Sequence, residues 1–517
     1  MSDALDANRI ARQNIIITNA LSFLNNAMFV VPIIVVYYAA QKSVGLTGFL
    51  VSEAAFALAM VLMEVPSGYL SDHWKRKYTL ALGFVIQTIG FVIMYVGEGF
   101  LLMVLAQAIC GLGMSFVSGT GSALIYDSLL GADAQNSNVD TGEQALKLRL
   151  QSAATEPSRR GKSFRAFERF KRTNASAEKR EVFQKERLNQ DMLKEDNGPA
   201  LTQWLTNSPS RSRYKVVLLG SLFSRSAKKV GVAQYSKISG RMHAYGMVGA
   251  AVSALAGGYI YSIGVEIPTI LSAVAMALAA VVSLGLVEVK RLKETQKKNA
   301  LKEMASVVKY ALGGHKEVAS ILLFSSSVFV VCNLMFFLHQ SYWVEGGIDT
   351  GQFGILMAIG MMVNALGSSL AYALENRLRF VQMVAIIAAL PLLSYGLAVV
   401  LPFGAGIYAL FLGGLAWGMG RPLMEAAVNR RIESDRRSTV MSVGSVLHRL
   451  AFVPLTFIAG PTAEAYGVKA AMIALLVLMA LTAGTSLVVM AKSGLLAVQR
   501  KLPTGEVGEQ VLAKPLR

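Results

Sequence analysis

The sequence predicts an all-α membrane protein with twelve transmembrane helices in two pseudo-repeated halves of six helices each. Three observations support this fold class: the hydropathy of the chain, the placement of its basic residues, and a charged loop that recurs in both halves. With 54% hydrophobic residues, 16% charged residues and a mean hydropathy of +0.48, the chain is more apolar than a typical soluble protein. Its apolar residues form runs of about 20, the length that crosses the hydrocarbon core of a bilayer as a helix.

Twelve apolar runs are the predicted membrane spans. They are Ile15–Ala39, Val51–Leu70, Tyr78–Val96, Leu101–Leu124, Met242–Ile263, Ile267–Val287, Ala319–Leu338, Gly351–Leu374, Phe380–Leu401, Gly406–Ala427, Val440–Ala459 and Val468–Val489. The opening segment Met1–Gln13 is polar and of mixed charge, unlike a signal peptide, so we expect the first span to remain as a membrane anchor.

The formal net charge of +18 is unevenly distributed among the loops. With the N-terminus inside, the inner loops contain Lys75-Arg76-Lys77, Lys290-Arg291, Lys297-Lys298, Arg377, Arg379, Arg430-Arg431 and Arg436-Arg437. The outer loops carry mainly acidic residues, and Lys42 and Lys469 are their chief cations. This positive-inside bias predicts that both termini are cytoplasmic. No nucleic-acid-binding motif accompanies the basic charge, so nucleic acid is not an expected partner.

The alternation of spans and polar stretches predicts six segments. Residues 1–130 hold helices 1–4 and residues 240–289 hold helices 5–6 of the N-terminal half, while residues 317–492 hold helices 7–12. Residues 290–316 form a central cytoplasmic linker and residues 493–517 a cytoplasmic tail. Residues 131–239 form a long basic cytoplasmic insertion between helices 4 and 5. Its Phe164, Phe167 and Phe170 favour an amphipathic helix on the membrane surface, and the alternative is a solvated insertion without a function of its own.

A short charged loop follows the second span. It reads Gly68-x-Leu70-Ser71-Asp72-x-x-x-Arg76-Lys77 and is preceded by Glu64-x-Pro66-Ser67. Asp72 lies one helical turn before Arg76. This pattern resembles the loop between the second and third helices of the major facilitator superfamily (MFS). His73 stands where an arginine is common in that family, and Lys75 where a glycine is common.

The loop after span eight repeats the same spacing. Laid on the first loop, it places Glu375 on Asp72 and Arg379 on Arg76. Span four ends in Tyr126-Asp127, which resembles a tyrosine–acid ending found in one branch of the superfamily. In another motif of this helix the family has an arginine near the position of Gln107, and this chain lacks it. The resemblance covers essentially the whole chain except the insertion.

The resemblance implies a conformational interlock. In the superfamily, the aspartate and arginine of the motif and an acid at the inner end of helix four hold the cytoplasmic side closed. Carried over by position, this interlock falls on Gly68, Asp72, Arg76 and Asp127. Glu375 and Arg379 are its counterpart in the second half.

Ionisable side chains within spans are costly in hydrocarbon and are therefore candidates for function. We single out Glu64 late in span two, Asp127 at the end of span four, His339 at the end of span seven, Arg421 and Glu425 in span ten, and His448 and Arg449 in span eleven. Glu64, Asp127 and Glu425 are candidates for proton coupling. Arg449 is the deepest and is a candidate for a buried ion pair or a substrate contact. Arg421 lies four residues before Glu425, so the two can pair on one helix face, either as a structural bridge or as part of coupling.

By the same resemblance, spans one, four, seven and ten are expected to line a central cavity. The candidate lining residues are Asn25, Asn26, Tyr126, Gln340, Trp417, Arg421 and Arg449. Each of them is equally explained by a hydrogen bond or packing contact between helices. The surroundings of these residues are mostly apolar and aromatic, which favours an amphipathic or lipophilic substrate.

The expected function is that of a secondary transporter that works by alternating access of its two halves. Proton-coupled efflux of a hydrophobic or amphipathic small molecule is the leading hypothesis. The alternatives are an uptake permease for a small metabolite, and a non-transporting membrane scaffold that acts through the cytoplasmic insertion. The expected partners are the substrate, a proton and the lipid bilayer, and we expect a monomer. The family branch suggests the bacterial inner membrane.

Sequence motifs of enzymes and cofactor sites are not found. The chain contains no His-Glu-x-x-His pattern, no Walker loop and no Gly-x-Ser-x-Gly elbow, so we expect neither an enzyme nor a bound cofactor. Cys110 and Cys332 both fall within predicted spans, which argues against a disulfide framework and a metal site.

Overall fold

The computed structural model describes residues 2–133, 235–288, 315–374, 377–432, 437–492 and 495–496. The interior of the predicted insertion and most of the linker and the tail lie outside these residues. Within them, every regular element is a helix. The chain forms two compact units, the first made of Met1–Arg12 and Asp127–Gln234, the second of Gln13–Tyr126 and Tyr235–Arg517. The second unit contains most of both helical halves.

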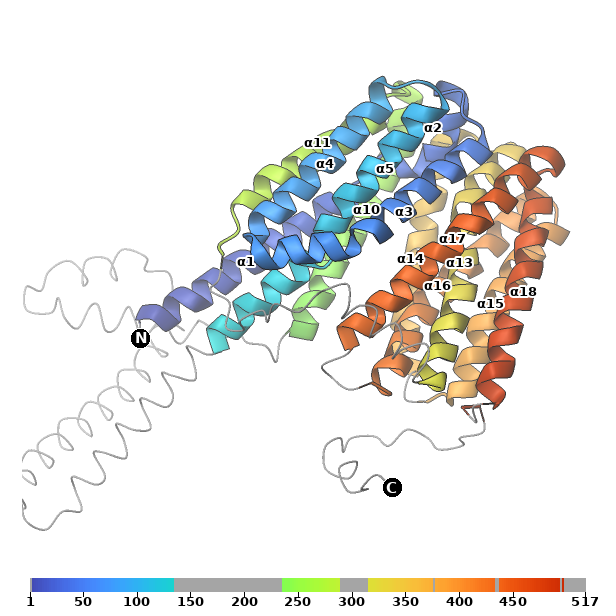
Figure 1. The fold of residues 1–517 in the computed structure, drawn as a ribbon. Coiled ribbons are helices and arrows are strands. Elements are labelled where there is room, and N and C mark those ends of the chain that lie inside the picture. Colours follow the sequence, from blue (N-terminus) through green and yellow to red (C-terminus); the bar gives the residue numbers. More distant parts are fainter. Residues whose placement is uncertain are drawn as a thin grey trace, which may run out of the picture. The chain divides into compact units, whose positions relative to one another are not determined.

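The described residues contain twelve helical segments long and apolar enough to cross a membrane, which confirms the predicted number. The first half consists of α1 (Ser2–Asn26), η1 (Val31–Ile33), α2 (Ile34–Gln41), α3 (Leu46–His73), α4 (Arg76–Val96), α5 (Gly99–Val117), a helix over residues 120–133, α10 (Tyr235–Ile263) and α11 (Ile267–Leu284). The second half consists of α13 (Lys316–Glu345), η5 (Thr350–Gln352), α14 (Phe353–Leu374), α15 (Phe380–Val400), α16 (Phe403–Asn429), α17 (Arg437–Tyr466) and α18 (Val468–Lys492). Figure 1 shows the helices of the two halves as two neighbouring groups, blue to green and yellow to red.

The first predicted span, Ile15–Ala39, is interrupted. Helix α1 ends at Asn26, and α2 begins only at Ile34 after the short helix η1. Pro32 lies in this interval, lacks a backbone N–H and clashes with a preceding helical turn, which accounts for the break. The first backbone N–H groups of α2 therefore have no partner within their own helix.

Small residues bring α4 and α5 into backbone contact. A Cβ atom added at Gly83 would lie 2.8 Å from the carbonyl oxygen of Gly113, and one added at Gly113 would lie 2.6 Å from the carbonyl oxygen of Gly83. Because lipid provides no hydrophobic driving force between helices, such close approaches supply the van der Waals contact that holds them together. Gly83 and Gly113 thus act as packing residues between these two helices.

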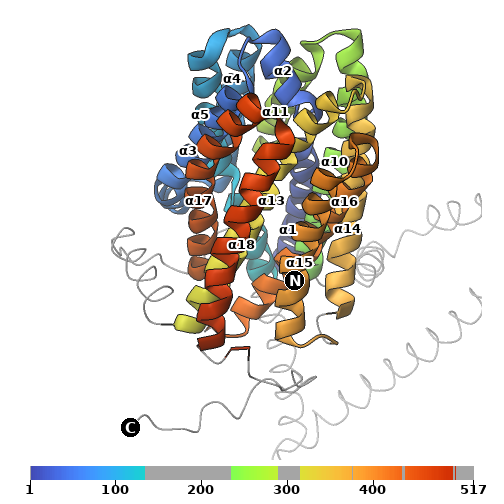
Figure 2. The same ribbon diagram turned by 90° about the vertical axis from the view of Figure 1, so that its right-hand side faces the viewer.

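Two helix pairs make the most extensive contacts between the halves: α3 packs on α17, and α10 packs on α14. Figure 2 shows α17 beside α3. A Cβ atom at Gly258 of α10 would lie 2.7 Å from the backbone nitrogen of Gly354, so these two helices are in backbone contact. The Glu464 carboxylate of α17 accepts hydrogen bonds from the backbone N–H (2.9 Å) and the hydroxyl (2.6 Å) of Thr47. The halves are thus in close contact at the end of the bundle where α3 and α14 begin, hereafter the closed end.

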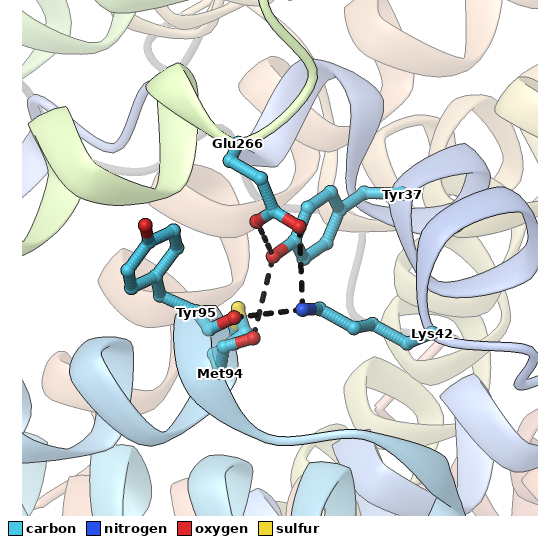
Figure 3. A network of polar contacts seen from close by, with 5 residues as sticks. All are labelled: Tyr37, Lys42, Met94, Tyr95 and Glu266. Carbon is cyan, nitrogen blue, oxygen red and sulfur yellow. Dashed lines mark hydrogen bonds and ion pairs between the residues drawn. The ribbon is translucent and has the colours of Figure 1, made fainter.

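A polar network ties the helices of the first half together at the same end (Figure 3). The Tyr37 hydroxyl lies 2.5 Å from the Glu266 carboxylate and 3.3 Å from the carbonyl oxygen of Met94. The Lys42 ammonium donates to the carbonyl oxygen of Tyr95 at 2.7 Å and lies 3.4 Å from Glu266. Lys42, a loop cation in the sequence, is only 5% exposed here. Glu266 balances the charge of Lys42. Without this partner the buried cation would be strongly destabilising.

Candidate functional site

A central cavity of about 460 Å³ lies between the two halves. Helices α3 and α5 of the first half and α13, α16 and α17 of the second half line it. Its lining includes Leu322 near the start of α13 and Val428 near the end of α16, so the cavity extends toward the end of the bundle opposite the closed end. Its charged or ionisable residues are Glu53, Arg421, Glu425, His448 and Arg449.

Glu53 projects from α3 into this cavity and is bonded to an uncharged group. The side-chain amide of Gln107 on α5 donates a hydrogen bond to the Glu53 carboxylate. Gln107 stands near the position where the resemblance led us to expect an arginine, and in this chain the partner of Glu53 is a neutral amide. Glu53 was not among the predicted coupling residues, although its place near the start of a predicted span was visible in the sequence.

Arg421 and Glu425 lie at the cavity on α16 and form the ion pair that their spacing predicts. The Arg421 guanidinium lies 3.1 Å from the Glu425 carboxylate. Their side chains are 62% and 44% exposed, so the pair lies in an open part of the cavity and contributes little to stability. A solvent-accessible pair of this kind can exchange partners with a charged ligand at low cost.

Glu64 and Arg449 form an ion pair between the two halves. The guanidinium of Arg449 on α17 lies 3.4 Å from the carboxylate of Glu64 on α3, and the two side chains are 20% and 24% exposed. Arg449 thus forms the ion pair for which it was a candidate. The neighbouring His448 ring lies 3.5 Å from the side-chain nitrogen of Asn333, a further polar residue of the cavity.

The remaining cavity wall is largely aromatic. Trp417 on α16 packs edge to face against Phe329, with ring centres 5.8 Å apart, and against His448 at 6.4 Å. Phe56, Phe337 and Phe452 also line the cavity. Of the predicted lining residues, Trp417, Arg421 and Arg449 are present in the wall.

The other four predicted lining residues are absent from this wall. Asn26 donates to the carbonyl oxygen of Ser22 within its own helix. Tyr126 is 42% exposed and packs edge to face on Tyr235. Asn25 lies on α1, which contributes nothing to the wall as described. Gln340 is fully buried where the halves meet, and its amide is bonded to the backbone of the interrupted first span.

The predicted interlock residues are only partly described. Arg76 is 8% exposed at the start of α4, and its backbone N–H donates to the Glu288 carboxylate at 3.1 Å. Glu288 was not predicted, and it stabilises the positive N-terminal end of α4. The side chain of Asp72 and the whole of Glu375 lie outside the described parts, and Asp127 belongs to the first compact unit.

Two further residues of the motif loops, Gly68 and Arg379, lie within the described parts of the chain. A Cβ atom at Gly68 would meet no described residue within 4 Å, so no described helix approaches Gly68 closely in this conformation. Arg379 forms the N-cap of α15, and its backbone N–H donates to Gln382 at 2.9 Å. No group of three or more metal-ligating side chains occurs among the residues that the structure describes.

Comparisons with known proteins agree with this geometry. A family model described as Major Facilitator Superfamily matches residues 15–133 and 225–454, more than half of the chain. A solved structure of the nucleoside transporter NupG is 13% identical with a TM-score of 0.59, covering 93% of this chain and 98% of that one. An inward-facing, occupied bacterial homologue of the human lysosomal transporter Spinster is 12% identical with a TM-score of 0.60 (93% and 96% covered). A D-xylose–proton symporter is 11% identical with a TM-score of 0.56 (93% and 96% covered). The search among curated proteins found no match.

Proposed function

This chain belongs to the Major Facilitator Superfamily, and on that premise we propose that it is a proton-coupled transporter that exports an amphipathic small molecule. The observation that carries the proposal is the central cavity, because both halves line it and it is closed at one end. A cavity shared by two halves can be exposed to each side of the membrane in turn when the halves rock against each other. Its volume of about 460 Å³ accommodates a small molecule.

The composition of the wall supports an amphipathic substrate. Five aromatic rings provide apolar surface, and the wall also carries ionisable groups at Glu53, the Arg421–Glu425 pair and Arg449. A ligand with an apolar body and one polar or charged group would satisfy both parts of such a wall. A sugar would require many more hydrogen-bonding side chains to replace its lost water.

Glu53 is the proton carrier that we propose. Glu64 and Glu425 are each paired with an arginine, so protonating either one would leave a cation without its partner. Glu53 is bonded to the neutral amide of Gln107, and a proton on its carboxyl breaks no ion pair. Asp127 remains a candidate for coupling as well as for the interlock.

The proposed orientation follows from the loop charges. The positive-inside bias puts both termini in the cytoplasm, and the closed end then faces outward. The central cavity extends toward the opposite, cytoplasmic end. We therefore propose that this conformation is inward-facing. We also propose that the chain acts as a monomer in a bacterial cell membrane.

Everted membrane vesicles test proton-coupled export. A proton gradient is imposed, and a pH-sensitive dye reports whether compounds from a panel graded in lipophilicity collapse it. We expect at least one amphipathic compound to do so with the wild-type chain. Glu53→Gln should abolish this response, because the amide cannot carry a proton. Glu98→Gln changes an exposed acid in the loop before α5 and should leave the response intact.

Two results contradict the proposal. One is the absence of a response across the panel while the protein is demonstrably in the membrane. The other is an undiminished response in Glu53→Gln, which would exclude Glu53 as the carrier and direct the next test to Asp127→Asn.

Uptake of a small metabolite is the second candidate function. Two similar solved structures are named a nucleoside transporter and a D-xylose–proton symporter. The central cavity also contains polar uncharged groups at Ser325, Ser326 and Asn333. Right-side-out vesicles with an inward proton gradient distinguish the two directions: accumulation of a labelled nucleoside or sugar favours uptake.

The interlock gives a separate prediction. We expect Asp72→Asn and Arg76→Ala each to reduce transport about fivefold, because the charge pairs that bias one conformation would be lost. Arg76 is buried at the start of α4, and Lys75 beside it is exposed, so Lys75→Ala is a matched control with little expected effect. Transport is measured at equal amounts of inserted, folded protein. Full transport by both variants would refute the interlock.

A further inference from the structure

A second cavity, the side cavity, lies next to the central one. Its volume is about 270 Å³, and helices α13, α14, α15 and α16 line it together with Met247 of α10. Asn333 and Trp417 line both cavities and form the wall between them. The side cavity is therefore built almost wholly from the second half, unlike the central cavity.

The wall of the side cavity carries no formal charge. Among the described residues that line it, none is an aspartate, glutamate, lysine or arginine. Most of its surface comes from aromatic and aliphatic side chains such as Phe336, Tyr395 and Phe411. An ionised ligand would lose its hydration here without gaining a counter-charge, which is strongly unfavourable. The ligand that fits this wall is uncharged.

Two polar groups in the wall have no hydrogen-bond partner. The indole N–H of Trp343 and the Nε2 atom of His339 are both buried, and neither is bonded to any described residue. Trp343 is 3% exposed overall. A buried polar group without a partner is destabilising, so each group favours a ligand that supplies the missing partner. The indole N–H can only donate, which calls for an oxygen acceptor on the ligand.

The rings that carry these groups are held in place by other rings. His339 lies between Trp343 and Tyr395, with centroids 6.2 Å and 5.9 Å away. Trp343 is packed edge to face on Phe353 at 5.0 Å. Rigid aromatic walls are suited to stacking with another ring, and pre-organised polar groups lose little entropy when they bind.

Gly360 keeps part of this space open. Among the described residues, a Cβ atom added there would meet only the Phe411 ring, at 4.0 Å. The backbone of α14 at this point thus faces free volume within the cavity, and a larger side chain can extend into it without a backbone clash.

We propose that the side cavity binds a small uncharged aromatic molecule of one or two rings that carries a hydroxyl or carbonyl oxygen. The oxygen accepts a hydrogen bond from the Trp343 indole N–H, and the ring stacks among the aromatic residues of the wall. This site does not depend on proton coupling, so it stands or falls separately from the transport function proposed above.

The test uses the purified full chain in lipid nanodiscs and three probes with one ring system. Equilibrium dialysis measures binding of 2-naphthol, naphthalene and naphthalene-2-sulfonate. Dialysis against empty nanodiscs corrects each value for partition of the probe into lipid. We expect saturable binding of 2-naphthol, about tenfold weaker binding of naphthalene, and no saturable binding of the sulfonate. The tenfold step corresponds to the loss of one buried hydrogen bond.

Three variants locate the binding. Trp343→Phe keeps an aromatic ring but removes the N–H, so it should weaken 2-naphthol about tenfold and leave naphthalene unchanged. Gly360→Leu fills the cavity and should abolish binding of both probes. Gly484→Leu is the matched control, because Gly484 lies on α18, lines neither cavity and has no described residue within 4 Å of an added Cβ.

Several outcomes would overturn the proposal. Saturable binding of the sulfonate as tight as that of 2-naphthol would show that the site is not selective for neutral ligands. An equal loss of affinity for 2-naphthol and naphthalene in Trp343→Phe would show that the indole N–H makes no hydrogen bond to the probe. Undiminished binding in Gly360→Leu, with Gly484→Leu behaving as the wild type, would place the bound probe elsewhere.

Discussion

Arg449→Ala is expected to reduce transport about thirtyfold. Arg449 pairs with Glu64 across the two halves at 3.4 Å, and about four fifths of each side chain is buried. Removing the arginine leaves the Glu64 carboxylate without a counter-charge where α3 packs on α17. Because both side chains keep some access to solvent, the penalty is about 2 kcal/mol rather than the 3–5 kcal/mol of a fully buried pair.

The double variant Glu64→Gln/Arg449→Met separates this cause from direct substrate contact. Neither residue then carries a charge, so no unpaired ion remains, and we expect transport to recover by about tenfold over Arg449→Ala. Arg241→Ala, which removes an exposed cation from α10, should behave as the wild type. Counterflow of a labelled substrate in proteoliposomes measures all three. A double variant as inactive as Arg449→Ala would show that Arg449 acts on the substrate and not through Glu64.

The number of spans and the pairing of local charges could be predicted because both depend on short stretches of sequence. Runs of apolar residues set the spans, and one helical turn brings Arg421 to Glu425. The break in the first span was also encoded, by Pro32, but its surroundings are so apolar that hydropathy alone predicts a continuous helix.

The partners of the remaining site residues could not be predicted, because they come from distant parts of the chain. Glu64 and Arg449 are 385 residues apart, and Arg76 and Glu288 are 212 apart. Each helix face offers several equivalent positions. The packing of α3 on α17 decides which of them meet in the first pair, and the packing of α4 on α11 brings Arg76 to Glu288. Glu53 was missed for a related reason. A single acid near the start of a span does not indicate a functional site by itself, and only the structure shows that Glu53 lines a cavity.

The interrupted first span explains the role of Gln340, a residue expected in the substrate cavity. Its side-chain oxygen accepts from the backbone N–H of Val35 at 3.0 Å, and its nitrogen donates to the carbonyl oxygen of Val31 at 2.9 Å. Val35 lies in the first turn of α2, where no helical carbonyl is available to its N–H. One side chain of the second half therefore completes the backbone hydrogen bonding of the first half.

Gln340→Leu is expected to destabilise the protein by about 2–4 kcal/mol, since a buried N–H loses its acceptor and a second hydrogen bond disappears. The midpoint of thermal unfolding in detergent should fall accordingly, and transport should fall with it because the contact joins the halves. Gln87→Leu makes the same substitution at a glutamine that is 2% exposed and whose side-chain nitrogen has no partner among the described residues. That variant should be neutral or slightly stabilised. Equal midpoints for the two variants would mean that the Val31 and Val35 backbone groups find other partners, and that Gln340 does not hold the closed end together.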